Sequence, residues 1–418
     1  MTMLERDGAL RRIAETCRFW LLDFWGPDWD WPRRRLLFKH YLAYFRNPDI
    51  PPEYLPEPGY AAAAAEQLAF TDAFRRKIEA VQRSTAKRQG VHLTYRPLGK
   101  NLRLLGTAIR EGTDRGRRVF IEPDGPPTER RALERRGHNW SPWLWVRTGP
   151  GEPSRDAAHA WNELFHNPPA TPEATGPVDP VQVPRLSAGA GPFSPSYLEL
   201  VLKLAVATRY VFSPVEPLMA RIERLKQEAG WPADRPVLGI HVRRGDAASA
   251  TEEEDEAPVL STRKSFPLGT YMKAADQICE RYGVRDIFLA TESRTEIERA
   301  TKLRPQYRFL WIDYDRSIFP DITKSSQFIE DLALENPDRA RSLAETAILD
   351  LYFFCECDAF IGAFNSEFSV LAWLLAMGSR GHAIPYISLS RAAGRRSLNP
   401  FNALLNLRNN CPLELYHW

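Results

Sequence analysis

Short apolar runs alternate with amphipathic stretches through the second half of the chain. Residues 237–242, 286–291 and 359–364 are rich in β-branched and aromatic residues and have the length of buried strands. Segments between these runs, such as residues 268–282, carry apolar residues at helical spacing. The same pattern predicts helices at 295–303, 340–357 and 367–377 and further strands at 309–312 and 383–389. Strands that alternate with helices predict an α/β fold whose parallel sheet is covered on both faces.

The first half contains one comparable unit. Residues 91–95 and 119–121 are predicted strands, and residues 102–111 between them are a predicted helix. Gly99 lies in the turn before this helix, where the N–H groups of a helix start can face an anion. A simple tight turn explains that glycine equally well. Longer helices are predicted at 61–88 and 197–228, and residues 123–195, rich in Pro and Gly, are predicted to be mostly loop.

The length of 418 residues favours two domains, because single cores rarely grow past roughly 250–300 residues. We predict an N-terminal α/β domain at 1–230, a Rossmann-like domain at 231–390 and a tail at 391–418 that packs back on the body. Aromatic residues are frequent in 3–46 and form either a packed helical cap or a platform for stacking sugars. Trp143 and two neighbouring tryptophans either line a sugar cleft or fix the long loop to the body.

Charge and cysteine content narrow the class of protein. Lys and Arg number 56 against 53 for Asp and Glu, so there is no electrostatic case for general nucleic-acid binding. The five cysteines are odd in number and scattered, which is typical of reduced thiols in a cytosolic protein. Residues 1–30 are charged throughout and match neither a membrane span nor a signal peptide. We therefore predict a cytoplasmic protein with no membrane span.

Two predicted strand ends carry groups that suit phosphate. The run 240–246 brings His241, Arg243 and Arg244 to one strand end, and the guanidinium fork matches phosphate oxygens. The second strand, at 359–364, leads into Asn365 and Ser366 and then into a helix, whose N-terminus offers unpaired N–H groups. Ordinary capping would need only one of these two residues. One phosphate-bearing ligand explains both strand ends together.

Acidic pairs suggest a metal only weakly. Asp313 and Asp315, like Asp28 and Asp30, form the D-x-D pattern that holds a divalent cation in one class of glycosyltransferases, but so short a pattern arises often by chance. No phosphate-binding P-loop sequence is present. We predict neither a metal nor a cofactor.

Three motifs in order resemble the α1,6-fucosyltransferase family and, more distantly, the protein O-fucosyltransferases. The first is 240–246, followed at helical distance by Tyr271, and the second is 287–292. The third runs from 348–351 through 358–361 to 364–367. The segment 99–102 is similar, more loosely, to the glycine turn of that family.

The resemblance implies a GT-B-like pair of Rossmann-like domains facing across a cleft that holds GDP-β-L-fucose. It places Arg243 on the β-phosphate, Arg244 close by at the donor or the acceptor, and Glu292 at either. His241 and Asp350 would meet the guanosine. The full predicted donor set is Gly99, Lys100, Asn101, His241, Arg243, Arg244, Glu292, Asp350, Asn365 and Ser366.

The chain departs from the family on the acceptor side. Ala247 and Thr251 stand where members that act on N-glycan cores have Lys and a Glu implicated as base. Glu252 follows directly and is the predicted base, although a solvated acidic loop also explains this run. The predicted catalytic residues are Arg243, Asp246 and Glu252, and the predicted acceptor contacts are Tyr271, Glu253 and Trp143.

The function implied is inverting, metal-independent transfer of L-fucose, of the α1,6 type, to a glycan hydroxyl of an oligosaccharide or glycoconjugate. Transfer to a protein hydroxyl, or use of another GDP-sugar, is the enzymatic alternative. A catalytically idle module that binds GDP or glycans is the alternative from another class. The acceptor, the linkage and the oligomeric state do not follow from the sequence.

Overall fold

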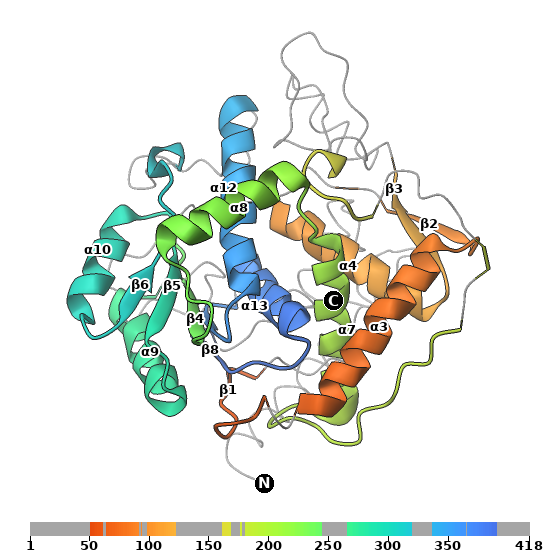
Figure 1. Ribbon diagram of the computed structural model, residues 1–418, viewed down its shortest axis with the longest axis horizontal. Coiled ribbons are helices and arrows are strands. Elements are labelled where there is room, and N and C mark those ends of the chain that lie inside the picture. The colour runs from red at the N-terminus through yellow and green to blue at the C-terminus, as the bar shows by residue number, and fades with distance from the viewer. Residues whose placement is uncertain are drawn as a thin grey trace, which may run out of the picture. The chain divides into compact units, whose positions relative to one another are not determined.

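The computed structural model describes residues 51–61, 64–91, 93, 98–122, 161–168, 176–177, 180–244, 266–319, 337–364 and 366–390. These residues all belong to one compact unit, Pro51–Arg391. Its principal feature is a six-stranded sheet with helices on both faces, accompanied by a separate pair of strands (Figure 1). The protein therefore has the predicted α/β fold.

The main sheet consists of β1 (Glu53–Tyr54), β4 (Val237–His241), β5 (Asp286–Ala290), β6 (Arg308–Leu310), β7 (Ala359–Gly362) and β8 (Tyr386–Ser388), and the pair consists of β2 (Arg88–Val91) and β3 (Arg118–Ile121). The described helices are α3 (Ala65–Arg83), α4 (Leu98–Asp114), α7 (Pro195–Val211), α8 (Glu216–Ala229), α9 (Leu268–Tyr282), α10 (Arg294–Leu303), the 3-10 helix η3 (Arg316–Ile318), α12 (Pro337–Cys355) and α13 (Glu367–Arg380).

The strand order of the main sheet is β1-β8-β7-β4-β5-β6. All neighbouring pairs are parallel except β1 with β8. From β4 the chain runs through β5 to β6 on one side, and then returns to β7 on the other side of β4. The strand order thus reverses between β4 and β7, and ligands of open α/β sheets bind at the carboxyl ends of the strands at such a point.

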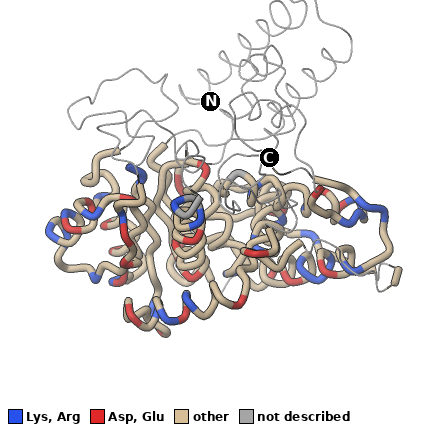
Figure 2. Tube along the Cα trace, turned by 90° about the horizontal axis from the view of Figure 1, so that it is seen from above, with Lys and Arg blue, Asp and Glu red and all other residues tan. Residues whose placement is uncertain are grey.

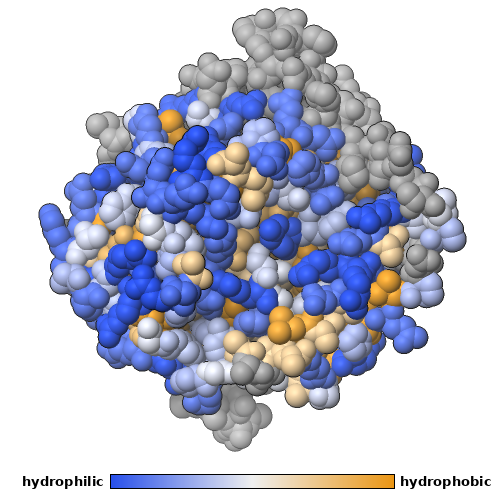
Figure 3. Space-filling view, viewed as in Figure 1, coloured by the Kyte–Doolittle hydropathy of each residue, from blue (hydrophilic) through white to orange (hydrophobic). Residues whose placement is uncertain are grey.

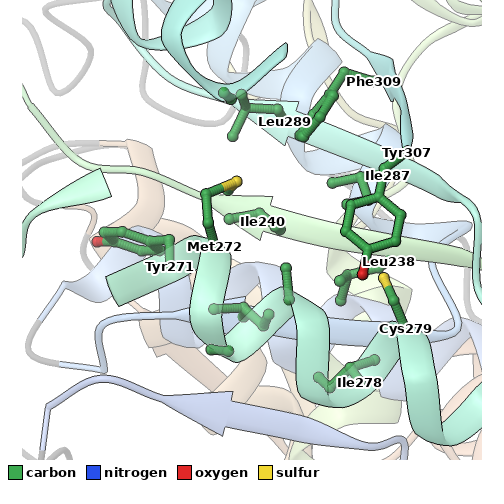
Figure 4. Packing of buried hydrophobic residues seen from close by; sticks show 14 of the residues in the cluster. Leu238, Ile240, Tyr271, Met272, Ile278, Cys279, Ile287, Leu289, Tyr307 and Phe309 are labelled. Atoms are coloured by element: carbon green, nitrogen blue, oxygen red, sulfur yellow. The ribbon is translucent and has the colours of Figure 1, made fainter. Parts of the chain in front are cut away.

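Alternation along β4 sends its side chains to two different layers. Leu238 and Ile240 point toward α9, where Met272 and Ile278 belong to the same buried cluster (Figure 4). Gly239 points the other way, toward α12, and a Cβ there would lie 2.7 Å from Cδ1 of Phe354. The strand is buried on both faces, as a central parallel strand requires.

Helix α7 joins the first half of the chain to the sheet layer. It lies between α13 and α4 (Figure 1). Both contacts use a glycine on the facing helix, because a Cβ on Gly378 of α13 would overlap the carbonyl oxygen of Ala205, and one on Gly106 of α4 would overlap Oγ1 of Thr208. The close backbone approach explains why α7 is buried around much of its surface.

Several predicted boundaries were wrong. Helix α4 begins at Leu98, not at 102, because its apolar stripe already starts there with Leu98 and Leu102, both buried. Strand β2 pairs with β3 through Arg88–Val91, earlier than the predicted strand at 91–95. Residues 92, 94 and 95 lie outside the described part.

Two further helix ends differ from the prediction. The single helix predicted at 197–228 is two helices, α7 and α8, because Pro214 cannot donate an N–H and Pro217 suits a helix start. Helix α13 continues through Gly378 and ends at Gly381, which adopts φ +75° at the C-cap. The remaining strands and helices of the second half match their predicted positions to within about three residues.

Strand β1 crosses the predicted domain division. It comes from the segment assigned to the first domain, yet it forms the edge of the sheet of the second domain by pairing with β8. The boundary at 230–231 otherwise stays a prediction. Residues 1–50, Trp143 and the tail 391–418 lie outside the described residues.

The described surface is mixed in charge. Basic and acidic residues are interspersed along the helices (Figure 2), and hydrophilic residues cover most of the face shown in Figure 3. Cys279, Cys355 and Cys357 are buried free thiols, as predicted for these three. Within the described ranges no helix is long and apolar enough to cross a membrane.

The contact between α13 and α7 gives a test of stability. Gly378→Ala should lower the free energy of unfolding by about 1–3 kcal/mol, because the added methyl group overlaps the Ala205 carbonyl. Gly269→Ala in α9 is the matched control, since a Cβ there meets no atom within 4 Å. Urea unfolding of both variants measures the difference. Equal stability of the two variants would contradict the close approach.

Candidate functional site

The carboxyl end of β4 carries the two predicted phosphate-binding arginines. The ladder continues one residue past the strand, as the N–H of Val242 donates to the carbonyl of Ala290 at 3.0 Å. Arg243 and Arg244 follow and are both partly buried. The pairing of β4 with β5 and β7 therefore places these two arginines at the edge of the sheet where the strand order reverses.

The carboxyl end of β7 leads directly into α13. The N–H of Ser366 donates to the carbonyl of Ala363 at 2.8 Å, forming a tight turn, and the helix begins at Glu367. Because β7 is the parallel neighbour of β4, this helix start and Arg243 lie at the same edge of the sheet. The structure thus brings together two of the elements predicted to bind phosphate.

Ser366 stands at the N-cap of α13 but does not cap it. Its side chain accepts no hydrogen bond from the helix, whereas Ser194 and Ser293 cap α7 and α10 in the usual way. The residue is 1% exposed, and its hydroxyl has no hydrogen-bond partner within the described structure. A buried hydroxyl without a partner costs about 1–3 kcal/mol. Ordinary capping therefore does not account for this serine.

His241 links β4 to α13. Its Nδ1 lies 2.7 Å from Oγ of Ser369, and its ring packs on Phe368 with centroids 4.7 Å apart. Burial lowers the pKa of His241 to about 3, with a further contribution from the charge of Arg243. The imidazole is therefore neutral at physiological pH and can bind or orient a ligand without adding charge.

Arg244 is committed to protein contacts. Its Nη1 donates to the carbonyl of Phe266 at 2.8 Å, and its Nε lies 3.3 Å from Oε1 of Glu296. Its backbone N–H donates to Oε2 of Glu292 at 3.1 Å. The predicted contact of Arg244 with donor or acceptor stays a prediction, while the described contacts show a place in the scaffold of the site.

Asp350 on α12 is a buried carboxyl group at this edge. The hydroxyl of Tyr314 donates to its Oδ2 at 3.1 Å. Burial raises the pKa of Asp350 to about 7, while the Tyr314 hydrogen bond and the charge of Arg316 lower it and the charge of Glu292 raises it. The carboxyl group thus changes charge near neutral pH. It also lies close enough to Glu292, which follows β5, for the two carboxyl groups to interact electrostatically.

The D-x-D pair 313–315 has structural partners. Asp315 caps η3 by accepting from the N–H of Ser317 at 2.9 Å, and Asp313 forms an ion pair with Arg294 at 3.0 Å. The residue between them, Tyr314, points to Asp350. Among the described residues no cluster of three or more His, Cys, Asp or Glu is arranged to hold a metal ion.

The start of α4 lies against α13. A Cβ on Gly99 would be 3.6 Å from Cδ2 of Leu371, and Arg103 forms an ion pair with Glu367 at 2.8 Å. Gly99 and Lys100 occupy the first turn of the helix and not a preceding loop, which corrects the prediction for the glycine turn. Asn101 is completely buried. The anion site predicted at this helix start stays a prediction.

Tyr271 lies in the core behind the arginines. It is 1% exposed, and its hydroxyl lies near the backbone of Arg243. Burial raises its pKa to about 12. Figure 4 shows the ring at the end of α9 beside Met272. Tyr271 therefore packs behind the Arg243 turn, and its buried side chain offers almost no surface to an acceptor.

Five predicted site residues lie outside the described residues: Asp246, Glu252, Glu253, Trp143 and Asn365. Others at the site were not predicted, namely Arg103, Tyr314, Arg316 and Ser369. Tyr314 had a signal, because it stands inside the acidic pair that was considered for a metal. Ser369 lies one helical turn from Ser366, and only the fold shows that it meets His241.

Comparisons with known proteins find structural neighbours only, since no family model and no curated protein matches. Fucosyltransferase NodZ from Bradyrhizobium is 16% identical, with a TM-score of 0.32 over 69% of this chain and 91% of that chain. A variant of Arabidopsis thaliana FUT1 in complex with GDP is 12% identical, with a TM-score of 0.32 over 73% and 72%. POFUT1 in complex with GDP-fucose is 8% identical, with a TM-score of 0.31 over 76% and 93%. Because these scores and identities are low, we take the chemistry of the site from the residues of the chain itself.

The buried carboxyl of Asp350 predicts a pH-dependent stability. Its pKa in the folded chain, about 7, is higher than the ordinary aspartate value of 3.8, so the native state binds this proton more tightly. The carboxylate therefore costs stability above about pH 7, and this cost disappears as the pH falls toward 4. Asp350→Asn should be more stable than the wild type at pH 8, with the difference shrinking by pH 5.

Urea unfolding at several pH values measures this difference between the two proteins. Tyr314→Phe is the companion variant, because it removes the hydrogen bond that favours the charged carboxylate. Its Asp350 should titrate at higher pH than in the wild type. A difference between wild type and Asp350→Asn that is independent of pH would show that Asp350 ionises normally.

Proposed function

We propose that the chain is a fucosyltransferase that uses GDP-β-L-fucose as donor and transfers L-fucose to a glycan hydroxyl with inversion and without a metal. The three ordered sequence motifs support the donor. The observation that carries the proposal is that Arg243 and the uncapped Ser366 follow the ends of the neighbouring parallel strands β4 and β7. Both groups suit a diphosphate, and ordinary capping does not account for Ser366.

The diphosphate would lie between Arg243 and the start of α13. A guanidinium can bind two phosphate oxygens at once, and the N-terminus of the helix contributes N–H donors and partial positive charge. The Ser366 hydroxyl would then donate to a phosphate oxygen, which supplies its missing partner. Asn365, which lies outside the described residues, completes this helix start in the proposal.

The guanosine would lie toward His241 and Asp350. Guanine presents ring and amino N–H donors, and an ionised carboxylate accepts hydrogen bonds only, so Asp350 favours guanine over bases that lack paired donors. His241 is neutral and fixed by Ser369, which suits a polar contact with an uncharged part of the nucleoside. Glu292 joins Asp350 to the arginine turn through the backbone of Arg244.

Catalysis would depend on stabilising the departing GDP. Negative charge grows on the β-phosphate as the bond to fucose breaks, and Arg243 together with the helix N-terminus would stabilise it, the work that a metal performs elsewhere. Inversion in a single displacement needs one base for the acceptor hydroxyl. We assign this role to Glu252, and Asp246 is the other predicted catalytic residue of this segment.

The first half of the chain would close the site as the second domain of a GT-B-like pair. Gly99, Lys100 and Asn101 stand at the start of α4, which contacts α13. Trp143 and Glu253, which lie outside the described residues, are the proposed acceptor contacts. Linkage of the α1,6 type follows from the sequence resemblance alone.

A donor assay tests the function directly. Wild-type protein with GDP-fucose, EDTA and a panel of glycans should release GDP only when an acceptor is present. Arg243→Ala should abolish turnover and weaken GDP binding measured by calorimetry, whereas Arg115→Ala, an exposed arginine at the end of α4, should change neither. GDP binding by Arg243→Ala equal to that of the wild type would refute the phosphate site.

Two further measurements test the mechanism. Activity that is lost in EDTA and restored by Mn2+ would refute metal independence. Unchanged turnover of Glu252→Gln would show that Glu252 is not the catalytic base.

Two serines on α13 separate ligand binding from folding. Ser366→Ala removes a hydroxyl without a protein partner, so it should leave the unfolding free energy unchanged or higher and weaken GDP binding. Ser369→Ala leaves His241 without its partner and should destabilise the fold by about 1–3 kcal/mol. Calorimetry with GDP and urea unfolding measure the two effects. Undiminished GDP affinity of Ser366→Ala would place the phosphates elsewhere.

A further inference from the structure

Arg244 connects three elements at the end of β4. Its guanidinium holds the carbonyl of Phe266, the residue two before α9, at 2.8 Å and the carboxylate of Glu296 on α10 at 3.3 Å. Its backbone N–H donates to Glu292 at the end of β5. The side chain is only 17% exposed. These contacts fix both the backbone and the side chain of one residue in the turn.

Glu296 is diverted from the role that the sequence suggests for it. Ser293 and Glu296 have the spacing of a capping box, in which the glutamate would reach back to the N–H of the serine. The serine does cap, as its Oγ accepts from the N–H of Glu296, but its own N–H donates to Thr291. The Glu296 carboxylate points instead to Arg244, and its Oε2 is buried with no hydrogen-bond partner within the described structure.

A buried ion pair of this kind contributes little net stability but sets geometry. Removing two charges from water offsets most of their attraction, so such a pair is weak as a source of stability. Losing one partner, however, leaves the other charge buried. The pair between Arg244 and Glu296 therefore holds the turn in one arrangement more than it stabilises the fold.

The residue that this arrangement controls is Arg243. Its backbone leads directly into the Arg244 N–H, which Glu292 holds by a hydrogen bond, and the buried Tyr271 lies beside it. The direction of the Arg243 side chain follows from this backbone. A guanidinium binds two oxygens at once only when its plane is correctly oriented.

We propose that Arg244 is a positioning residue, held by Glu296, that orients Arg243 for the diphosphate of the donor and does not itself bind the donor. The inference rests on the proposed function, because it assumes that Arg243 binds phosphate. It differs from the expectation from sequence, which placed Arg244 at the donor or the acceptor. Glu296 then affects donor binding through Arg244, without contacting the donor itself.

A double-mutant cycle tests this role. Glu296→Gln should weaken GDP binding about tenfold when Arg243 is present, and by less than about twofold in the Arg243→Ala background. Arg244→Lys should behave like Glu296→Gln, because one ammonium lacks the fork that spans Phe266 and Glu296. Arg299→Gln is the matched control, since Arg299 contacts the same oxygen of Glu296 at 3.3 Å but is 43% exposed and does not belong to the turn after β4. Calorimetry with GDP gives the affinities, and thermal unfolding shows that each variant is folded.

Amide hydrogen exchange gives a second reading that needs no ligand. The peptide 237–244 should exchange about tenfold faster in Glu296→Gln than in the wild type, with exchange in α13 unchanged. The exchange measurement tests the positioning role even if the Arg243→Ala variants bind GDP too weakly to measure. A merely structural role would change the unfolding temperature but not the coupling to Arg243.

Losses that add in the cycle, or unchanged exchange of the peptide, would overturn the positioning role while GDP binding by the wild type leaves the proposed function standing. Wild-type protein that binds no GDP would overturn the proposed function and this role with it. Coupled losses together with faster exchange are the expected result.

Discussion

The parallel pairing of β4 with β5 on one side and β7 on the other is the constraint on which the site depends. Parallel strands end at the same edge of a sheet, so the residues that follow them meet whatever their distance in sequence. The arginine turn after β4, Glu292 after β5 and the start of α13 after β7 converge for this reason. The strand order reverses between β4 and β7, which is the kind of place where open α/β sheets bind ligands.

The apolar layers hold this edge in place. Leu238 and Ile240 bind β4 to α9, and the missing side chain of Gly239 lets the aromatic residues of α12 reach the opposite face. Helix α13 begins at the proposed phosphate site and is held by α7 through the close contact at Gly378. Packing in the centre thus positions polar groups at the rim, where a shift of about 1 Å is enough to impair a site.

Polar groups at the rim are fixed by partners that sequence periodicity does not reveal. His241 is matched with Ser369, Asp350 with Tyr314, and Arg244 with Glu296. Each pair joins two elements far apart in the chain. Sequence reasoning named one member of each pair, because the motif residues stand at strand or helix ends, and missed the other, which is an ordinary polar residue on a neighbouring element. Glu296 shows this most clearly. Its spacing from Ser293 is that of a capping box, but in the fold its carboxylate pairs with Arg244.

The sequence by itself determined the alternation of strands and helices, the parallel sheet of the second half and the two strand ends that carry the candidate phosphate groups, because these follow from local periodicity and capping chemistry. Only the tertiary structure decided that β4 and β7 are neighbours, that Ser366 leaves its helix uncapped, that Tyr271 lies in the core and that Arg244 faces Glu296. Such facts depend on which elements pack together. Packing is a property of the whole chain, since burial and hydrogen bonding at one residue are set by elements that its own neighbours in sequence do not specify.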